Sequence, residues 1–406
     1  MRICFLSSLH TPTDKRVFDK EAVSLAAAGF EVIHLAPGPK GLCVKDGVQI
    51  LTYPSARGIW GRIWNGPKLF WQALRLKADC YHCNEVDSWM LGVALKVFLS
   101  CKVVFDAHEA YPEEFAESRF PKALRPSVSF CIRLLFRLLT AASDRIVLAK
   151  ASIASDFPNG PDKRVLVRNY VSIAYAQEDS RQRAKTEHRL RMRIIHVGLI
   201  SRSRGWPQLL ASLCAASEEM EILFVGQFND GSEPEFHACA AQLGVADRVS
   251  VEPWLPFHEA FRRVADSDVG VVAFQPGRYN HVHALPHKMF DYMVAGLPIV
   301  VPSFAVEVSR IVREADCGLI VDSADPSSIR EALEFLARRA DERTRLGENG
   351  RQAVLTRYNW DREARTLENM YWELFAPESE PPSSESTRDT PEDSTDAKER
   401  TGDARY

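Results

Sequence analysis

The sequence predicts an α/β protein with two doubly wound domains, each built on a parallel β-sheet. Short apolar runs alternate with helical patterns along most of the 406 residues, as expected when helices connect parallel strands and cover both faces of a sheet. The alternation is interrupted once, by a polar and charged segment at residues 172–191 that we predict to be a linker. The chain exceeds one ordinary domain and fits two domains of about 170 to 190 residues with a tail.

The first domain is expected at residues 1–171, with helices such as 14–28 and 86–99 between predicted strands at residues 3–7, 31–36, 48–53, 80–84, 102–107, 145–148 and 165–168. The second domain, residues 192–355, repeats the pattern with strands at residues 193–197, 221–225, 249–252, 269–274, 299–302 and 319–321. Only helical patterns follow residue 324. We expect a last helix at residues 356–376 and a disordered acidic tail at residues 377–406, which is rich in Pro, Ser, Thr, Asp and Glu.

Composition excludes several classes of protein. With a net charge of −3 and 26% charged residues, the chain lacks the excess of basic charge that nucleic-acid binding requires. The N-terminus begins directly with a strand pattern, so we predict no signal peptide. No segment offers about 20 uninterrupted apolar residues for a membrane span. Nine cysteines, an odd number, suit reduced thiols, and we expect a cytoplasmic protein.

Two patterns resemble metal sites, and we interpret both as structural. Cys80 and Cys83 have redox or zinc spacing, but no second pair accompanies them and their segment has the pattern of a buried strand. Asp266 and Asp268 form a D-x-D pattern between a helix and a strand, without a second ligand cluster. Neither domain opens with the G-x-G-x-x-G turn of dinucleotide sites. We therefore predict no metal and no cofactor.

The segment 285–298, LPHKMFDYMVAGLP, carries the strongest functional signal. Pro286 suits the first position of a helix, and Gly296 suits the position just past its end. Lys288 would then lie in the first turn, where the helix dipole disfavours a cation unless an anion is bound. We predict a phosphate site there, with Asp291 one turn on to accept hydrogen bonds from neighbouring hydroxyls. The alternative is a local ion pair between Lys288 and Asp291.

A second basic turn, residues 198–205, connects a predicted strand to a predicted helix. Gly198 permits close approach to the backbone, and Arg202 and Arg204 lie where a diphosphate would meet the start of that helix. The alternative is two arginines on a surface loop.

In the first domain, the predicted strand 102–107 delivers polar residues at its carboxyl end, where open α/β sheets bind ligands. His108 can donate to a substrate hydroxyl or exchange a proton near neutral pH. The alternative is a structural histidine satisfied by Asp106. The preceding strand is followed in the same way by Asn84, Glu85 and Asp87.

The segment 121–142 mixes bulky apolar residues with Lys122, Arg125, Arg133 and Arg137. It can form a basic amphipathic helix that rests on an anionic membrane. The alternative is a helix packed on the first sheet with its arginines extended to solvent.

These motifs together resemble family 4 glycosyltransferases. The run FDYMVAGLPIV, residues 290–300, resembles the family's "EYM-A-GLP-V" donor helix, and VVFDAHEAYPEE resembles its "D-x-HE-x-x-P" strand end. The segment HCNEVDSW resembles the family's "HAHD-x-D" loop, and Asp14 and Arg16 fall on its N-terminal "D-x-R" signature. The resemblance covers residues 1–375 in motif order. It implies the GT-B fold, in which two Rossmann-like domains face a cleft and the last helix crosses back to the first domain.

The resemblance also implies roles for individual residues. His108, Arg204 and Lys288 would be catalytic, and the sugar-nucleotide donor would be bound by Gly198, Arg202, Arg204, His283, Lys288 and Asp291. The acceptor-side candidates are His10, Asp14, Arg16, Asn84, Glu85 and Glu109, although Asp14 reads equally well as a helix cap. The chain departs from the family where Asp291 replaces the second Glu of its Glu-x7-Glu pair, where His283 replaces the first, and where Leu199 replaces an arginine.

The sequence therefore predicts a retaining, metal-independent glycosyltransferase. Its substrates would be a nucleotide-sugar donor and a glycan or lipid-linked acceptor, as in the biosynthesis of a cell-surface polysaccharide or glycoconjugate. Peripheral contact with an anionic membrane would place it at the inner face of the cytoplasmic membrane. A non-catalytic nucleotide-sugar binding subunit, or a sugar-nucleotide epimerase of the same fold, is the alternative.

Overall fold

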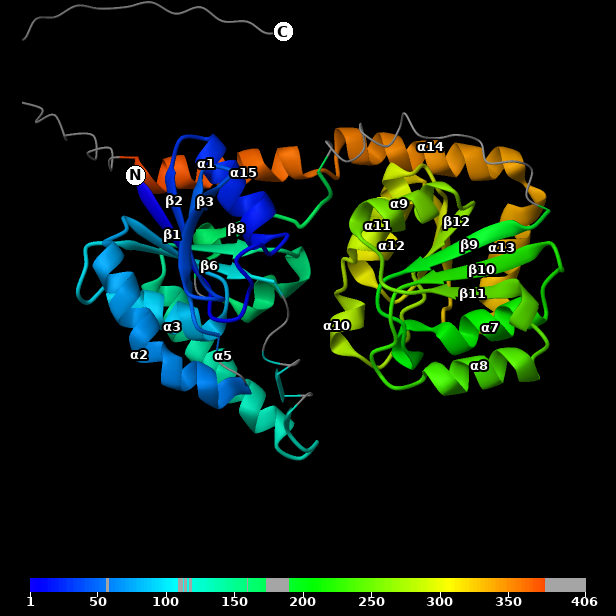
Figure 1. Ribbon diagram of the computed structural model, residues 1–406, viewed down its shortest axis with the longest axis horizontal. Coiled ribbons are helices and arrows are strands. Elements are labelled where there is room, and N and C mark those ends of the chain that lie inside the picture. Colours follow the sequence, from blue (N-terminus) through cyan, green and yellow to red (C-terminus); the bar gives the residue numbers. More distant parts are fainter. Residues whose placement is uncertain are drawn as a thin grey trace, which may run out of the picture.

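A computed structural model describes residues 1–55, 58–108, 112, 115–116, 119–158, 160–172 and 190–376. The chain forms two α/β domains that lie side by side, each with a central sheet of mainly parallel strands covered by helices (Figure 1). The predicted linker at residues 172–191 lies almost entirely outside the described residues, and so does the predicted tail.

The first domain contains an eight-stranded sheet in the order β3-β4-β2-β1-β5-β6-β7-β8. Its strands are β1 (Arg2–Leu6), β2 (Glu31–Pro37), β3 (Gly41–Lys45), β4 (Val48–Tyr53), β5 (Cys80–Cys83), β6 (Lys102–Ala107), β7 (Arg145–Leu148) and β8 (Arg164–Leu166). All neighbours are parallel except β3 and β4, which form an antiparallel hairpin at the edge. The predicted strands are confirmed, and β3 is an addition whose five residues are all exposed. Cys80 and Cys83 are buried within β5, in agreement with their interpretation as strand residues.

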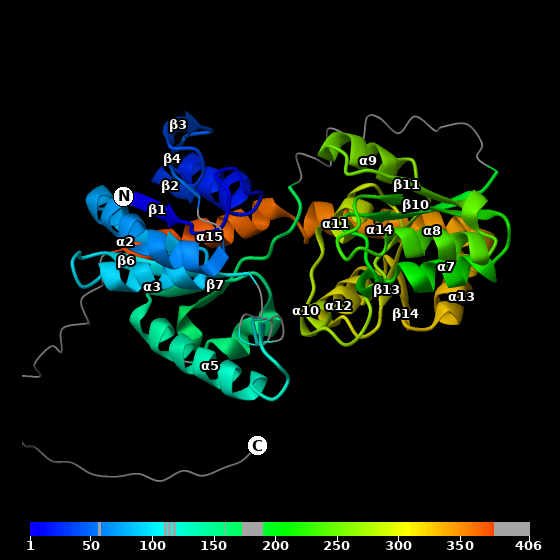
Figure 2. The ribbon, with the colours of Figure 1, turned by 60° about the horizontal axis from the view of Figure 1, so that its bottom comes forward.

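The helices of the first domain are α1 (Val23–Ala27), α2 (Gly58–Leu76), α3 (Val86–Leu95) and α5 (Arg125–Ala142). The predicted helix at 14–28 begins as a π-helix, η1 (Val17–Ala22), which continues into α1. The helix predicted at 121–142 begins four residues later, at Arg125, with Pro126 in its first turn. Helices α2, α3 and α5 lie together on one side of the sheet (Figures 1 and 2).

The second domain contains a six-stranded, fully parallel sheet in the order β11-β10-β9-β12-β13-β14. Its strands are β9 (Met192–Val197), β10 (Met220–Val225), β11 (Val249–Glu252), β12 (Val269–Val271), β13 (Ile299–Pro302) and β14 (Gly318–Val321). The helices around it are α7 (Trp206–Cys214), α8 (Glu233–Gln242), α9 (Phe257–Ala265), α10 (Tyr279–Val282), α11 (His287–Val294), α12 (Val306–Ala315), α13 (Pro326–Arg338) and α14 (Ala340–Thr356). All six strands occur where the sequence predicts them.

The last helix, α15 (Trp360–Phe375), returns to the first domain. Its buried residues, among them Leu367 and Tyr371, pack in one apolar cluster with Phe5 of β1. Asn359 caps the helix by accepting a hydrogen bond from the backbone N–H of Arg362. Figure 1 shows α15 along the first domain and α14 along the second, so the chain crosses between the domains twice.

Candidate functional site

The start of α11 places a lysine inside the second domain. Pro286 precedes the first helical residue as the N-cap, one position earlier than predicted, and Gly296 follows the C-cap with φ +68°. Lys288 is therefore in the first turn, and it is only 7% exposed. A buried ammonium at the positive end of a helix is unfavourable unless an anion joins it.

The ammonium of Lys288 contacts a histidine at the carboxyl end of β9. Its Nζ atom lies 3.1 Å from Nε2 and 3.3 Å from Nδ1 of His196. Nε2 of His196 also lies 3.2 Å from the carbonyl oxygen of Leu199. A carbonyl can only accept, so the ring proton faces Leu199 and Nδ1 is left to accept from the lysine. Burial and the charge of Lys288 hold the pKa of His196 well below its usual range, so this imidazole is neutral.

Arg204 approaches the same place from the turn that follows β9. Gly205 has φ +84°, and a Cβ atom there would lie 2.1 Å from the carbonyl oxygen of Ala273, so only glycine fits. This close approach sets the Arg204 guanidinium 5.4 Å from the centre of the Phe274 ring, and Lys288 lies 5.9 Å from the same centre. Gly198, with φ +103°, has open space where a side chain would be, so its backbone is accessible to a ligand.

Arg204 and Lys288 have no carboxylate partner within the described part of the chain. Burial and then the charge of Arg204 lower the pKa of Lys288 well below its ordinary value. Burial and the charge of Arg278 lower that of Arg204. Each cation therefore destabilises its neighbours while the site is empty. An anion of two or more charges would relieve all of these costs together.

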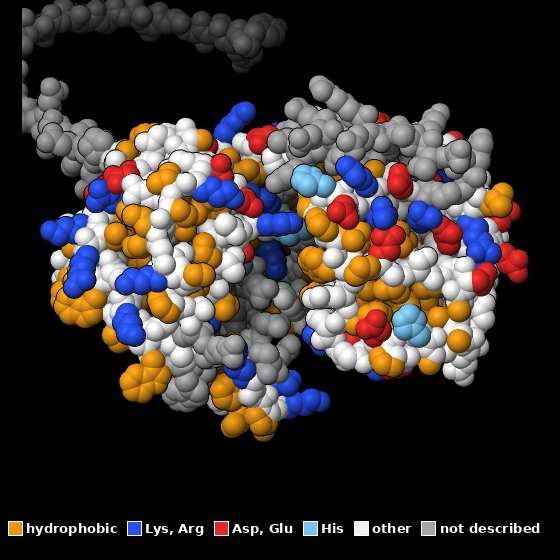
Figure 3. Space-filling view, in the orientation of Figure 1, with side chains coloured by type: hydrophobic (Ala, Val, Ile, Leu, Met, Phe, Trp, Pro, Cys, Tyr) orange, Lys and Arg blue, Asp and Glu red, His pale blue; other side chains and the backbone are white. Residues whose placement is uncertain are grey.

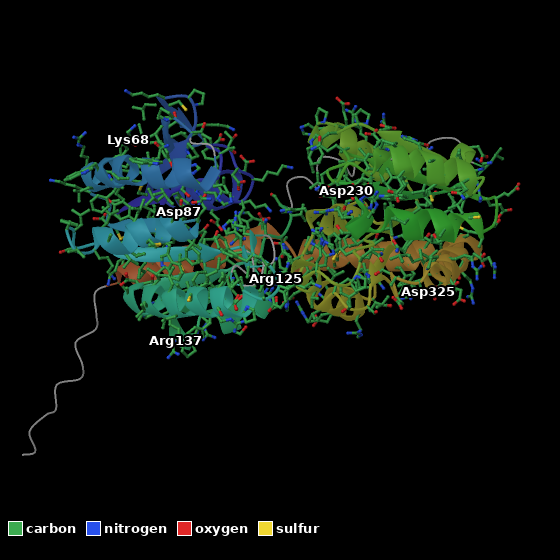
Figure 4. The ribbon with its side chains drawn as sticks, turned by 90° about the horizontal axis from the view of Figure 1, so that it is seen from below. Lys68, Asp87, Arg125, Arg137, Asp230 and Asp325 are labelled. Atoms are coloured by element: carbon green, nitrogen blue, oxygen red, sulfur yellow. The ribbon has the colours of Figure 1, made fainter. Side chains whose placement is uncertain are left out.

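Arg202 differs from Arg204, although the sequence places both in one turn. Its half-exposed guanidinium pairs with Asp230 at 3.7 Å and with Glu235 of α8. Its backbone N–H also donates to Asp230 at 2.8 Å. Figure 4 labels Asp230 in the second domain. Two carboxylates thus neutralise Arg202. Of the Lys and Arg side chains predicted at this site, Arg204 and Lys288 have no carboxylate partner among the described residues.

Asp291 lies one turn beyond Lys288 on α11. Lys288 contacts His196, and no ion pair between Lys288 and Asp291 occurs among the described residues, so the local pair offered as an alternative does not form. Burial raises the pKa of Asp291 to about 6, and the charges of Lys15 and Lys20 from the first domain partly offset that rise. The carboxylate therefore faces the boundary between the domains, near the cations of the other domain.

His283 is the C-cap residue of α10, and its ring lies 4.6 Å from that of Tyr279. Tyr279 in turn packs against the apolar core of the first domain. His283 is thus on a segment that contacts both domains.

In the first domain, His108 follows β6 and leans on a buried carboxylate. Its Nε2 atom lies 2.6 Å from Oδ2 of Asp106. Arg16 donates to both oxygens of Asp106, at 2.7 and 3.0 Å. Burial raises the pKa of Asp106, but the charges of Arg16 and His108 outweigh burial and hold it well below its usual range. Asp106 is therefore an anion that fixes the orientation of the His108 ring.

Arg16 itself is 4% exposed, and all three of its nitrogens are engaged inside the domain. Besides Asp106, it contacts Glu21 at 3.0 Å and the carbonyl oxygen of Val167 at 3.1 Å. The acceptor-side role predicted for Arg16 therefore has no support in its contacts, which are structural.

Glu85 clamps the loop that follows β1. It accepts hydrogen bonds from the backbone N–H groups of Ser8, Leu9 and His10, and from Nδ1 of His10 at 2.7 Å. Burial opposes ionisation, but these donors lower the pKa of Glu85 to about 2. Burial also lowers the pKa of His10, yet Glu85 raises it overall. The clamped His10 ring lies 5.0 Å from the ring of His108, so two imidazoles stand together at the carboxyl edge of the first sheet.

The other acceptor-side candidates have simpler positions. Asn84 is fully buried and donates to the hydroxyl of Ser7 at 2.9 Å. Asp14 accepts from the backbone N–H groups of Arg16 and Val17, which is the capping role offered as its alternative. Asp87 pairs with Arg62. Glu109 lies outside the described residues.

One buried cluster has the composition of a metal site. Ligand atoms of Glu21, His82 and Asp106 lie within 4.8 Å of one another. Arg16 bridges the two carboxylates, so a cation already occupies this position. Nδ1 of His82 forms a hydrogen bond of 2.7 Å with the hydroxyl of Tyr371 on α15. This bond connects the last helix to the cluster. The arrangement is structural.

The two domains also meet at single contacts. The Asn169 side-chain amide lies 2.8 Å from Nε2 of His287, the first residue of α11. Lys15 lies over the ring of Phe257 at 4.9 Å. Figure 3 shows Lys and Arg side chains along the hollow between the domains. The start of α11, which carries Lys288, therefore lies at the contact between the two domains.

His196 and Phe274 were not predicted from the sequence as site residues. Each lies in or after a buried strand and has the pattern of an ordinary core residue. The only local signal is their place at the carboxyl ends of β9 and β12, where α/β sheets bind ligands.

Two family models match the chain. Residues 16–174 match the family described as Glycosyltransferase Family 4, and residues 191–339 match the family described as Glycosyl transferases group 1. The spore coat protein SA of Bacillus subtilis (strain 168) is 24% identical over 269 residues, which cover 62% of this chain and 69% of that protein.

Solved structures share the fold. HepE of Anabaena in complex with UDP has a TM-score of 0.69 at 12% identity, over 92% of this chain and all of that one. A glycosyltransferase of Rickettsia africae reaches 0.70 at 12% identity, covering 92% and 98% of the two chains. Sucrose-phosphate synthase of Thermosynechococcus elongatus reaches 0.67 at 16% identity, covering 93% and 99%. The architecture described above is therefore the GT-B fold.

Proposed function

Because the chain belongs to the group 1, family 4 glycosyltransferases, we propose that it is a retaining, metal-independent enzyme that uses a nucleoside diphosphate sugar as its donor. One observation carries this proposal. Lys288 and Arg204 converge over Phe274 at the start of α11, and the described residues provide no carboxylate to neutralise them. The leaving group of such a donor is a diphosphate, which supplies the missing negative charge.

Lys288, Arg204 and the positive end of the α11 dipole would stabilise the charge that develops on the diphosphate as the glycosidic bond breaks. Such preorganised donors act mainly by electrostatic stabilisation of the transition state. The open backbone at Gly198 would let the phosphates approach the turn. Asp291, one turn along the helix, would accept hydrogen bonds from the ribose hydroxyls. UDP is the first nucleotide to test, because structures of HepE hold UDP and UDP-glucose.

The first domain would supply contacts on the sugar and acceptor side. Asp106 holds Nε2 of His108, so Nδ1 of His108 is left for the substrate. This nitrogen can accept a hydrogen bond from a hydroxyl when only Nε2 carries a proton, and can donate one when both ring nitrogens do. His10 stands beside His108 and would contribute to the same face. Closure of the domains would bring this face to the donor.

We propose a glycan or lipid-linked acceptor and peripheral contact with an anionic membrane through α5. Phe130, Leu134 and Leu138 recur every four residues and are at least half exposed. Arg133 and Arg137 are exposed beside them, and Figure 4 shows Arg125 and Arg137 towards opposite ends of the helix. The opposite face of α5 buries Phe136 and Leu139, so core packing and an exposed apolar stripe coexist on one helix. No described helix is long and apolar enough to cross a bilayer.

Transfer is tested by measuring nucleoside diphosphate released from sugar nucleotides, with and without candidate acceptors. Acceptor-dependent release is expected, and NMR of the product should show the anomeric configuration of the donor. Inversion would overturn the retaining mechanism. A chelator should leave the rate unchanged, and loss of activity that a divalent ion restores would reopen the role of Asp266 and Asp268.

The same assay separates the alternatives. A non-catalytic subunit would bind the sugar nucleotide without releasing diphosphate. A sugar-nucleotide epimerase would convert the sugar without any acceptor.

A further inference from the structure

A third basic residue, Arg278, begins the short helix that packs on the ring shared by Arg204 and Lys288. The ring of Phe274, which both of those side chains cover, also stacks on His281 of α10, with ring centres 4.7 Å apart and an interplanar angle of 15°. Arg278 is the N-cap of α10, and its carbonyl oxygen accepts a hydrogen bond from the backbone N–H of His281 at 3.0 Å. Arg278 is therefore one helical turn from the group that packs on the shared ring.

The charge of Arg278 acts on two residues of this site, Arg204 and His281. After burial, its charge is the next cause that lowers the pKa of Arg204. It also contributes to lowering that of His281, after burial and Arg204. Helix α10 lies on the side of the second domain that faces the first (Figures 1 and 2). The residue after Arg278, Tyr279, packs on the core of the first domain.

The side chain of Arg278 is exposed. Within the described residues it forms no hydrogen bond and no ion pair. Arg204 and Lys288 likewise have no anionic partner there. Arg204 and Lys288 thus cover one aromatic ring, and Arg278 begins the helix that packs on it, with no anion beside them among the described residues. The like charges repel one another in the empty site, and a ligand with several negative charges removes that cost.

We infer that Arg278 is a binding residue for the diphosphate of the donor, and that it completes a three-cation site with Arg204 and Lys288. This inference rests on the proposed function. Arg202, the cation that the sequence suggested as a replacement for the arginine missing at Leu199, is already paired with Asp230 and Glu235. Arg278 would provide the positive charge that the family has at the position of Leu199. It follows Phe274 in the sequence, whereas Arg202 precedes it.

The test compares two arginines of the second domain. Arg278→Ala should weaken the binding of both UDP and inorganic pyrophosphate by about tenfold to a hundredfold, the effect expected for one charge-assisted hydrogen bond. Arg202→Ala is the matched control and should change neither affinity by more than about twofold, since its charge is already neutralised. Arg278→Lys should restore much of the binding, because the point charge is kept. Uridine, which carries no phosphate, should bind all variants equally.

The outcomes separate this inference from the proposed function. If the wild-type protein binds UDP, Arg204→Ala abolishes that binding and Arg278→Ala behaves like Arg202→Ala, the assignment of Arg278 is overturned and the donor site stands. If Arg278→Ala weakens uridine as much as UDP, the residue acts on the fold of α10 and not on the phosphates, which also overturns the assignment. A wild-type protein that binds neither UDP nor pyrophosphate would overturn the assignment and the proposed function together.

Discussion

The Nζ atom of Lys288 lies 3.1 Å from Nε2 of His196, so two basic groups share one buried position at the end of β9. Neither has a carboxylate within reach among the described residues, and burial with neighbouring charge lowers the pKa of both. The empty site therefore disfavours the charged lysine, and a bound diphosphate favours it. Binding of the donor should be coupled to protonation of Lys288.

We first predict that UDP binding takes up protons at pH 8. In the free protein, burial and Arg204 lower the pKa of Lys288 well below its ordinary value, so the lysine is partly or wholly deprotonated above that lowered pKa. The bound diphosphate raises the pKa again, so a proton is taken up and affinity falls as the pH rises. Calorimetry in two buffers of different ionisation enthalpy measures the uptake. At pH 8 Asp291, with a pKa of about 6, is ionised and does not contribute.

Lys288→Arg is the matched variant for this experiment. An arginine remains charged at all accessible pH values, so it should bind UDP without uptake of protons. Equal uptake in the wild type and in Lys288→Arg would assign the titration to a different group.

A second prediction is that Lys288→Met makes the unliganded protein more stable and inactivates it. A lysine whose folded pKa lies below its unfolded value lowers stability by its full cost below the folded pKa. That cost declines as the pH rises from the folded to the unfolded pKa, because the unfolded chain binds more protons in that range. Replacing it with an apolar side chain should stabilise the protein by roughly 0.5–2 kcal/mol at neutral pH. The diphosphate would lose one donor that stabilises its charge in the transition state, so turnover should fall by about 10²-fold.

Thermal unfolding without nucleotide checks the first part and a steady-state assay checks the second. The gain in melting temperature over the wild type should shrink as the pH rises, since the wild-type lysine then becomes neutral in the unfolded chain as well. A melting temperature below that of the wild type at neutral pH would contradict the interpretation of Lys288 as an uncompensated buried charge.

The sequence predicted the strands well because most of them are buried on both faces and therefore appear as uninterrupted apolar runs. Strand β3 was missed for the converse reason: its five residues are all exposed, and it is held only by pairing with β4. Lys288 and Arg204 could be identified from local signals, a helix start and a glycine turn. The local pattern also placed Gly296 at the end of α11.

The contact partners of these residues could not be predicted from the neighbouring sequence. His196 is separated by 92 positions from Lys288, and Arg16 by 90 positions from Asp106. His196, a single histidine in a strand, and Arg16, a basic residue near a loop, could each have many roles. Their contacts depend on how the whole chain folds. The D-x-R signature thus suggested an acceptor contact for Arg16, but it could not reveal that the guanidinium is paired with the buried Asp106.

A third prediction concerns Asp291 and the ribose. Asp291→Asn should weaken UDP binding by about 1–3 kcal/mol, because an amide replaces a charged acceptor of two hydroxyl hydrogen bonds. Asp291→Glu keeps the carboxylate and should retain most of the affinity. Calorimetry with UDP makes the comparison, and inorganic pyrophosphate should bind both variants like the wild type. Unchanged UDP affinity in Asp291→Asn would exclude the ribose role.

A fourth prediction is that Asn169 couples the first domain to α11. Lys20 donates to Oδ1 of Asn169 at 2.7 Å, and a lysine can only donate, so the amide NH₂ must face His287. The neutral ring of His287 then accepts this hydrogen bond and fixes the start of the helix that carries Lys288. Asn169→Ala should raise the KM for the donor severalfold, since one partly exposed hydrogen bond contributes about 0.5–1.5 kcal/mol.

Two further variants isolate the coupling. Asn349→Ala also removes an exposed amide, one that donates to the carbonyl oxygen of Asp316 inside the second domain, and it should leave the KM unchanged. The double variant Asn169→Ala/His287→Ala should resemble either single variant if the two side chains act as one unit. Additive effects would show that they act separately.

The last prediction tests the membrane contact of α5. Replacing Arg133 and Arg137 by Glu should release the protein from vesicles that contain anionic lipid, because each arginine near such a surface adds on the order of 1 kcal/mol to binding. The exposed stripe of Phe130, Leu134 and Leu138 would remain but could not hold the protein alone against the reversed charge.

The double variant Arg262→Glu/Arg338→Glu makes the same change in net charge on exposed arginines of the second domain and should still sediment with vesicles. Both variants should keep their activity on a soluble acceptor analogue, because none of the four arginines belongs to the proposed donor site. A wild-type protein that stays in the supernatant even at low salt, where charge attraction is strongest, would leave α5 as a packing helix whose apolar stripe serves another contact.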